Sequence, residues 1–480
     1  MRNTRPFITL IVALSMAACT STTNYYGQDP EMQSALSPAQ SPVQPRAKNV
    51  ILFIGDGMGI STITAARIYA GQKLGQTGEE YVLPFERFDN VALVKTYNTD
   101  AQVPDSAGTA TAMHSGEKTR IGMLGVGPGA DKADCRTAAE HALPLLGEEA
   151  TQRGLALGIV STARLTHATP ASVYARSNSR DWEADAAFPE KQAGFECRDI
   201  ALQLIESDFD VALGGGKAAF YGENTGGWRS VADADLPAMW ATRTGGTVVH
   251  SASELDAASS DMPVLGLFTA SHMTYMAERE TASIEPTLTD MTAAAVKRLG
   301  ADPDGYYLMV EGGRIDHAHH AGRAGFALEE AAEFARAIQY AVDNTNPAET
   351  LILVTADHSH VFTIAGYPQR GNPILGHVVA PPESGKGEGS LVLARDGKPY
   401  TTLGYGNGPG AISRERAVPE TGLQARQQAA IPTDSETHGG EDVALYGSGP
   451  GAQGVRGVIE QNRIFHIIRS AFGWGAPGAE

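Results

Sequence analysis

The sequence predicts an α/β fold in which helices cover both faces of a large, mostly parallel β-sheet. Five apolar runs show no alternation with polar residues, which is typical of strands buried on both faces. Helical stretches lie between these runs, and strands that alternate with helices favour parallel pairing. With 480 residues, the chain is long enough for one large domain of this kind with insertions.

The expected elements follow one another regularly along the chain. The expected strands are Val50–Ile54, Leu155–Val160, Phe209–Leu213, Tyr306–Val310 and Leu351–Thr355. The expected helices include Cys197–Ser207, Leu288–Leu299 and Ala327–Asn344. Residues 361–435 interrupt this pattern with glycine, proline and polar residues, and they predict an insertion that lies over the core.

Composition indicates a globular enzyme and excludes several other classes. Hydrophobic residues make up 42% of the chain and charged residues 19%, with 54 glycines, which excludes a coiled coil or a long disordered protein. The formal net charge of -18 argues against nucleic acid as the main partner. An anionic substrate would need bound cations to reverse this charge locally.

The first residues predict an export signal. The apolar run Phe7–Ala18 follows two arginines and is too short to span a bilayer as a helix. The small residues before Cys19 favour a bacterial lipoprotein signal, while plain secretion stays open as the alternative. We therefore predict a signal peptide over 1–18, lipidation of Cys19 and a periplasm-facing, outer-membrane lipoprotein. A flexible tether is expected over 19–47, before a domain over 48–472.

Polar side chains follow four of the predicted strands at the point where each strand ends. These side chains are Asp56, His167 with Thr169, Glu311, and Asp357 with His358. The carboxyl ends of parallel strands meet at one edge of a sheet, where such folds bind ligands. One aspartate after a strand is usually a turn residue or a helix cap, but four such ends indicate a metal site.

Two histidine-rich segments offer further metal ligands. If a helix begins near Ile315, Asp316 and His320 lie at positions i and i+4 on one face and can share a metal ion such as zinc. His360 follows the Asp357-His358 pair and could either bind a metal or orient another ligand. His438 is distant in sequence, and its flanking glycines do not settle whether it is a ligand or a surface histidine.

Ser106 is the candidate nucleophile. With Asp105 it precedes a run of small residues that predicts a helix, and free N–H groups at a helix start attract an anion. The alternative is an ordinary helix cap, because a serine hydroxyl needs a base or a metal to become a nucleophile. Arg180 is one candidate for binding a tetrahedral oxyanion, but the residues alone do not separate it from Arg164 or Arg176.

Six motifs in a fixed order give the chain a resemblance to a known family. The motifs are Gly55-Asp56-Gly57-Met58-Gly59, Asp105-Ser106-Ala107-Gly108-Thr109, Thr166-His167-Ala168-Thr169-Pro170, Val310–His320, Thr355–Phe362 and Glu436–Asp442. From Asn49 to about Phe472 the chain resembles the alkaline phosphatases. The resemblance implies a three-layer α/β/α sandwich, hydrolysis of phosphate monoesters, two zinc ions and one magnesium ion, and a homodimer.

The resemblance also implies a role for each site residue. Ser106 is expected to become a phosphoserine, and Arg180 to clamp the phosphate. The expected ligands are Asp316, His320 and His438 for one zinc, Asp56, Asp357 and His358 for the other, and Asp56, Thr169 and Glu311 for magnesium. Asp105, His167, His317 and His360 are expected to support these groups. A further calcium site is not expected, because Phe268 is followed by Thr269 instead of glutamate.

The remaining cysteines and the competing functions complete the prediction. Cys135 and Cys197 are expected to pair in an exported chain, as the animal-type members of the family also imply; two buried thiols are the alternative. A phosphodiesterase or an arylsulfatase is the nearest competing function, but the residues around Ser106 do not supply the sulfatase motif. A non-catalytic metal-binding or phosphate-binding lipoprotein would have no need of Ser106.

Overall fold

The structure is a computed structural model, and it describes most of the chain from residue 46 onward. The described ranges are 46–132, 134–189, 197–385, 387–413 and 415–475. They belong to one compact unit, Pro45–Glu480. The predicted signal peptide, Cys19 and nearly all of the predicted tether lie outside the described residues. Among the described residues, no helix is both long and apolar enough to cross a membrane.

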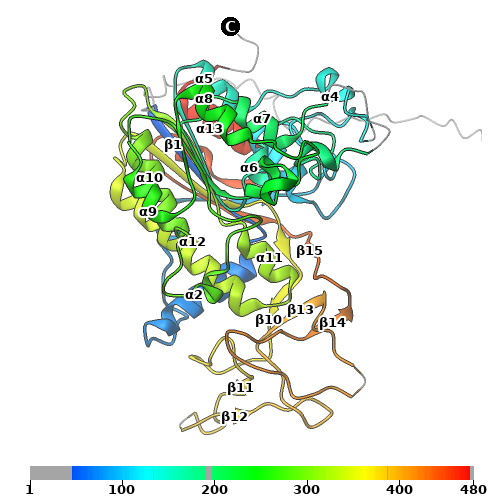
Figure 1. The fold of residues 1–480 in the computed structure, drawn as a ribbon. Helices are drawn as coiled ribbons and strands as arrows, with labels where there is room; N and C mark the ends of the chain where they lie inside the picture. The colour runs from blue at the N-terminus through cyan, green and yellow to red at the C-terminus, as the bar shows by residue number, and fades with distance from the viewer. Residues whose placement is uncertain (1–45, 133, 190–196, 386, 414, 476–480) are drawn as a thin grey trace, which may run out of the picture. The chain divides into compact units, whose positions relative to one another are not determined.

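A ten-stranded, mostly parallel sheet forms the centre of the fold (Figure 1). Its order is β17-β2-β16-β8-β1-β7-β3-β4-β6-β5. Its strands are β1 Asn49–Gly55, β2 Asn90–Lys95, β3 Ala156–Arg164, β4 Val211–Gly215, β5 Thr247–Val249, β6 Val264–Leu267, β7 Tyr306–Glu311, β8 Thr350–Ala356, β16 Val443–Ser448 and β17 Gly457–Glu460. Within this sheet β16 alone runs antiparallel to its neighbours. The predicted fold class is confirmed.

The five predicted strands correspond to β1, β3, β4, β7 and β8, with small shifts at their ends. Nearly every residue of these strands is buried, which explains their continuous apolar runs. The sequence did not reveal β2, which alternates exposed and buried residues: Val91 and Leu93 are exposed, while Ala92 and Val94 are buried.

Two groups of helices pack on the sheet. The helices are α2 Ile60–Lys73, α3 Ser106–Ser115, α4 Thr137–Glu140, α5 Leu146–Gln152, α6 Ala168–Ala171, α7 Ile200–Glu206, α8 Leu236–Thr244, α9 Ala252–Ala257, α10 Leu288–Leu299, α11 Arg314–His320, α12 Ala324–Asn344 and α13 Arg463–Phe472. Helix α12 contacts α2, α10 and β1, whereas α3 contacts α5, α6 and α13. The expected helices are confirmed in α7, α10 and α12, although α7 begins three residues later than predicted and α12 three residues earlier.

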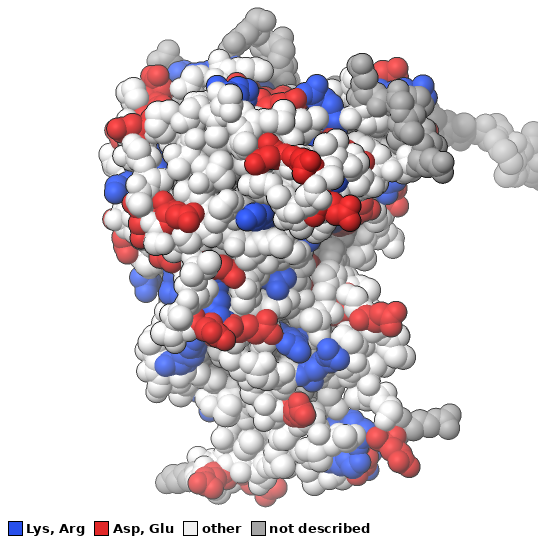
Figure 2. Space-filling view, in the orientation of Figure 1, with Lys and Arg blue, Asp and Glu red and all other residues white. Residues whose placement is uncertain are grey.

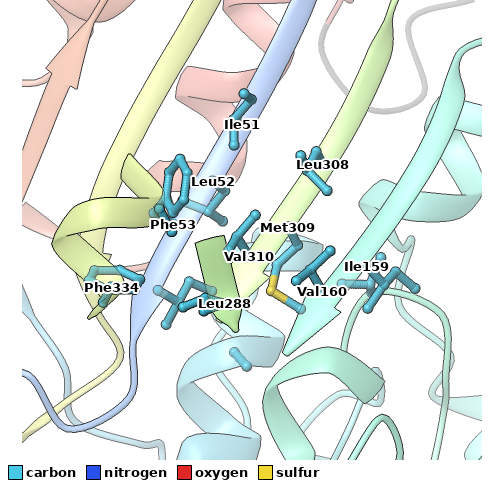
Figure 3. Packing of buried hydrophobic residues seen from close by; sticks show 14 of the residues in the cluster. Ile51, Leu52, Phe53, Ile159, Val160, Leu288, Leu308, Met309, Val310 and Phe334 are labelled. Carbon is cyan, nitrogen blue, oxygen red and sulfur yellow. The ribbon is translucent and has the colours of Figure 1, made fainter. Parts of the chain in front are cut away.

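The register of the central strands assigns the two helix groups to opposite faces. Phe53 on β1 is paired with Val310 on β7, and its ring packs edge-on against Phe334 of α12, with centroids 5.9 Å apart. Figure 3 shows this packing around β1, β7 and β3. Tyr307 on β7 has the opposite parity and faces His114 of α3, with centroids 6.1 Å apart. The strands are therefore covered on both sides, as their sequences require.

The predicted insertion, residues 361–435, contains short strands outside the central sheet. They are β10 Phe362–Ile364, β11 Val379–Ala380, β12 Ser390–Leu391, β13 Leu403–Gly408 and β14 Ala429–Pro432. The insertion begins and ends at the pair β9 (Ser359–His360) and β15 (His438–Gly439), in which His438 lies opposite His360. This pairing brings His438 back to the end of β8.

Candidate metal centre and nucleophile

The strand-end residues predicted from the sequence meet at one edge of the sheet. Asp56 directly follows β1, Glu311 ends β7, and Asp357 with His358 follows β8. Because β8, β1 and β7 are adjacent, these four side chains are neighbours, and each is completely buried. Thr169 lies in α6, shortly after β3, and is also buried.

A first cluster consists of Asp316, His320 and His438. Asp316 and His320 lie one turn apart on α11, as expected, with Asp316 Oδ1 3.3 Å from His320 Nε2. His438 Nε2 lies 3.4 Å from the same oxygen and 3.1 Å from His320 Nε2. The Nδ1 atoms of the two histidines point to the carbonyl oxygens of Glu436 and Pro104, at 2.6 and 2.8 Å. An Nδ1–H that donates to a carbonyl leaves the lone pair of Nε2 for a metal.

A second cluster consists of Asp56, Asp357 and His358, with Ser106 beside it. His358 Nε2 lies 3.3 Å from Asp56 Oδ1 and 3.3 Å from Asp357 Oδ2. Ser106 Oγ lies 3.1 Å from the same nitrogen and 3.5 Å from Asp56 Oδ1. His358 Nδ1 faces the carbonyl of Ser359 at 3.2 Å. Burial keeps the pKa of His358 well below its usual value, so its Nε2 lone pair is available.

A third cluster shares Asp56 with the second. Asp56, Glu311 and His167 each place one ligand atom within 4.8 Å of the others. Glu311 also accepts a hydrogen bond from Ser161. Burial raises the pKa of Glu311 to about 7, and the negative charges of Asp357 and Asp316 add to the effect. The oxygen-rich ligand set of Asp56, Glu311 and Thr169 suits a hard cation such as magnesium.

The burial and charge of the side chains in these clusters indicate binding sites for divalent cations. Within the described chain, buried oxygen atoms of several site residues have no hydrogen-bond partner. They are Asp56 Oδ2, Asp357 Oδ2, Glu311 Oε1 and Thr169 Oγ1. Burial, followed by repulsion from the other carboxylates, raises the pKa of Asp56 well above its usual value. Buried, unpaired carboxylates that repel one another are costly unless cations lie among them.

Ser106 is the first residue of α3, and Asp105 caps this helix. Asp105 Oδ1 accepts a hydrogen bond from Gly108 N at 3.1 Å, as in an ordinary N-cap. Ser106 is only 2% exposed. The helix-capping role that was the alternative for Ser106 therefore belongs to Asp105. The hydroxyl of Ser106 points instead at the second cluster. A helix start beside cation ligands favours an anion at this position.

The structure distinguishes the three candidate arginines. Arg164 pairs with Glu183 and Arg176 with Glu148. Arg180 instead donates from Nη1 to Asp105 Oδ2 at 3.1 Å. Its Nη2 lies 3.0 Å from His167 Nε2. Arg180 is thus tied to the residue that precedes Ser106, where a bidentate guanidinium can face a phosphate.

His360 lies behind the first cluster. Its Nδ1 is 2.5 Å from Glu436 Oε2, and its Nε2 is 2.9 Å from Asp316 Oδ1. Although burial opposes protonation, these two carboxylates raise the pKa of His360 to about 9. From this position His360 can orient Asp316 through its Nε2. Glu436 was not singled out from the sequence, where it reads as one of several acids near His438.

A cluster of three imidazoles borders the third cluster. The ring centroid of His317 is 5.4 Å from that of His167 and 4.0 Å from that of His272. Arg314 Nη1 lies 3.2 Å from His317 Nδ1. Burial lowers the pKa of His317 to about 3, which keeps it neutral. His272 was not predicted from the sequence. The signal that could have indicated it is its position, five residues after the end of β6.

Cys135 and Cys197 form a disulfide bond, with their Cα atoms 5.9 Å apart. The predicted pairing is confirmed, and the alternative of two free thiols is wrong for this structure. The bond joins two segments that are 62 residues apart in the sequence.

Surface charge gives little help in locating an anion site. On the face in Figure 2, lysine and arginine lie interspersed with aspartate and glutamate. The groups suited to a phosphate lie instead at the sheet edge: a helix start, one arginine and ligand sets for cations. A buried serine beside ligand sets for divalent cations, at the edge of a parallel sheet, is typical of metal-dependent hydrolases such as phosphatases.

Comparison with known proteins narrows this class to one family. The model of the family described as alkaline phosphatase matches residues 47–474. The tissue-nonspecific alkaline phosphatase of Gallus gallus is 44% identical over 451 residues, covering 88% of this chain and 84% of the relative. The corresponding Homo sapiens isozyme is 41% identical over 455 residues, covering 90% and 84%. The chain belongs to the alkaline phosphatase family.

Solved structures agree with the fold. The alkaline phosphatase of the Antarctic bacterium TAB5 superposes with a TM-score of 0.63 at 24% identity, covering 90% of this chain and 100% of that chain. The Thermus thermophilus alkaline phosphatase gives a TM-score of 0.65 at 24% identity, covering 90% and 92%. At this identity the likeness supports the fold alone.

Proposed function

We propose that this alkaline phosphatase hydrolyses phosphate monoesters through a covalent phosphoserine on Ser106. The observation that carries the proposal is the position of Ser106 Oγ, 3.1 Å from His358 Nε2 and 3.5 Å from Asp56 Oδ1, at the start of a capped helix. An isolated serine hydroxyl is a poor nucleophile. Here it faces a ligand set that can hold a cation beside it.

Two zinc ions and one magnesium ion are the proposed cofactors. One zinc would be held by Asp316, His320 and His438. The other zinc would be held by Asp56, Asp357 and His358, and the magnesium by Asp56, Thr169 and Glu311. Mixed imidazole and carboxylate sets suit zinc, and an all-oxygen set suits magnesium. When bound, such ions lower the pKa of a coordinated hydroxyl and stabilise negative charge on oxygen.

The protein's own groups would position the substrate and carry the covalent step. Arg180 would bind two phosphate oxygens through its planar guanidinium, with Asp105 fixing its orientation. Ser106 would lose its hydroxyl proton to solvent, and its Oγ would attack phosphorus in line, forming the Oγ–P bond as the bond from phosphorus to the alcohol oxygen breaks. The alcohol would leave after taking up a proton from water. A second water would then lose a proton and attack phosphorus from the side that the alcohol left; the Oγ–P bond breaks, inorganic phosphate is released and Ser106 Oγ takes up a proton. The free N–H groups at the start of α3 favour this anionic group.

Turnover of p-nitrophenyl phosphate tests this proposal. We expect Ser106→Ala to lower kcat by at least about a thousandfold, because the covalent route is lost. Ser115→Ala is the matched control: Ser115 is a buried serine at the other end of α3, and its hydroxyl donates to the carbonyl of Glu117. Undiminished turnover by Ser106→Ala would contradict the proposal, as would a preference for bis-p-nitrophenyl phosphate, a diester.

The proposed location and assembly rest on the sequence and on the family. The chain is proposed to be exported and anchored by a lipid on Cys19, and the disulfide suits an oxidising compartment. Labelling with radioactive palmitate would test this: label on the wild type but not on Cys19→Ala is expected, and an unlabelled wild type would contradict it. A homodimer is also proposed, and light scattering giving the mass of one chain would contradict it.

A further inference from the structure

Arg180, the proposed phosphate clamp, lies on a segment without regular secondary structure. Residues 176–183 connect α6 to the region before α7. The side-chain contacts of Arg180 with Asp105 and His167 orient its guanidinium. The guanidinium can keep this position only if the backbone beneath it is held. An isolated antiparallel bridge pairs Ser177 with Leu124 through two backbone hydrogen bonds of 2.8 and 2.9 Å. A backbone hydrogen bond also holds the segment at Arg180 itself, whose N–H donates to the carbonyl of Gly122 at 2.8 Å.

The side chain of Asn178 also holds this segment in place. Its side chain is completely buried, two residues before Arg180. Its Nδ2 donates to the carbonyl of Asp131 at 2.7 Å, with the carbonyl of Asp134 at 3.1 Å and Thr137 Oγ1 at 2.8 Å. All three acceptors lie within four residues of Cys135. One buried amide therefore ties the Arg180 segment to the loop that carries one half of the disulfide.

The other half of the disulfide holds the far end of the segment. Cys197 lies three residues before α7, whose first two amides donate to this segment: Ile200 N to the carbonyl of Trp182 at 3.0 Å, and Ala201 N to the carbonyl of Glu183 at 3.1 Å. The side chain of Gln203, also on α7, hydrogen-bonds to the backbone N and O of Arg176. Both ends of the segment are thus tied to residues that follow Cys197.

The disulfide joins these two anchors, and the segment borders an open pocket on this side. The pocket measures about 370 Å³ and is lined among others by Cys135, Cys197, Asn178 and Trp182. Side chains that line an open pocket have fewer packing partners than those in a filled core. Hydrogen bonds and one covalent bond must therefore determine the position of the segment on this side.

We propose that Asn178 and the Cys135–Cys197 disulfide are positioning elements for Arg180. They hold its backbone where the guanidinium meets both Asp105 and the phosphate. This inference rests on the proposed role of Arg180. Loss of either element lets the segment shift, which weakens phosphate binding. The three ligand clusters and Ser106 lie on other segments and stay in place.

Inhibition by inorganic phosphate is the direct test. For Asn178→Ala we expect the inhibition constant of phosphate, and KM with it, to rise about tenfold, because a small displacement of a binding group is enough for such a loss. The change in kcat should be smaller, and zinc and magnesium contents should equal those of the wild type. Asn372→Ala is the matched control: its Nδ2 also bonds to two carbonyl oxygens and a threonine hydroxyl, within the insertion. It should leave the inhibition constant unchanged.

A double-mutant cycle separates positioning from general destabilisation. In an Arg180→Ala background, Asn178→Ala should not weaken phosphate binding further, and neither should the double variant Cys135→Ser with Cys197→Ser. A full additional effect in that background would overturn the inference, as would unchanged inhibition by phosphate in both Asn178→Ala and the double serine variant. If Arg180→Ala itself leaves phosphate binding unchanged, the proposed role of Arg180 fails. If Asn178→Ala does not fold, the cysteine variants still test the inference.

Discussion

Replacing Gly57 by alanine should damage the protein in two separable ways. Gly57 adopts φ +66, which L-residues other than glycine rarely adopt. A Cβ there would lie 2.5 Å from His360 Cδ2 and closer still to Nε2. His360 cannot move away easily, because Glu436 holds one of its nitrogen atoms and Asp316 faces the other. The imidazole must therefore shift together with Asp316, a proposed zinc ligand.

The size of this effect follows from two contributions. The left-handed conformation costs about 1–2 kcal/mol for alanine. Forcing a methyl group into a filled site costs about 1–3 kcal/mol more. Gly57→Ala should thus lower the free energy of unfolding by about 2–5 kcal/mol. Gly75→Ala is the matched control, because Gly75 has φ +77 and an added Cβ would meet nothing within 4 Å. It should show only the first contribution.

Urea unfolding of both variants in the same metal-containing buffer measures these costs. Zinc content and kcat/KM are measured on the same samples. We expect Gly57→Ala to lose zinc and activity, and Gly75→Ala to retain both. Equal unfolding free energies for the two variants, with full zinc in each, would refute the reasoning, because the contact with His360 would then have no consequence.

Three further predictions concern the disulfide, a buried acid and the metals. The double variant Cys135→Ser with Cys197→Ser should lower the free energy of unfolding by about 2–4 kcal/mol; no change in urea unfolding would contradict this. Burial raises the pKa of Glu330 from 4.5 to about 7, so the folded protein keeps a proton that the unfolded chain loses in this range, and stability falls as the pH rises through it. Glu330→Gln should remove about 3 kcal/mol of that fall between about pH 4 and about pH 8, and equal pH slopes of unfolding free energy in both proteins would refute it. EDTA should abolish phosphatase activity and zinc with magnesium should restore it, whereas activity that persists in EDTA would rule out the metal centre.

The sequence revealed those parts of the fold whose burial is uniform. Strands such as β1 and β8 are covered on both faces, so their residues are apolar throughout and stand out. Strand β2 leaves Val91 and Leu93 exposed, and the short β5 and β6 contain too few residues for a clear pattern. The order of strands in the sheet depends on long-range pairing, which local periodicity does not contain.

The candidate site shows the same division between local and long-range information. Asp316 and His320 could be paired from their spacing, because helix geometry fixes which residues share a face. His438 could not be placed, since only the pairing of β15 with β9 brings it to the first cluster. The three arginines look alike in sequence, and the contact with Asp105 distinguishes Arg180. The imidazole of His272 comes from a loop after β6 and joins His317 through tertiary packing alone.

Identification of the phosphorylated residue tests the central claim most directly. The enzyme would be incubated with radiolabelled inorganic phosphate at acidic pH, quenched in acid and digested, and the labelled peptide sequenced. We predict label on the peptide that carries Ser106, at Ser106 itself, and none in Ser106→Ala. Label on another residue, or a labelled Ser106→Ala variant, would contradict the assignment of Ser106 as the nucleophile.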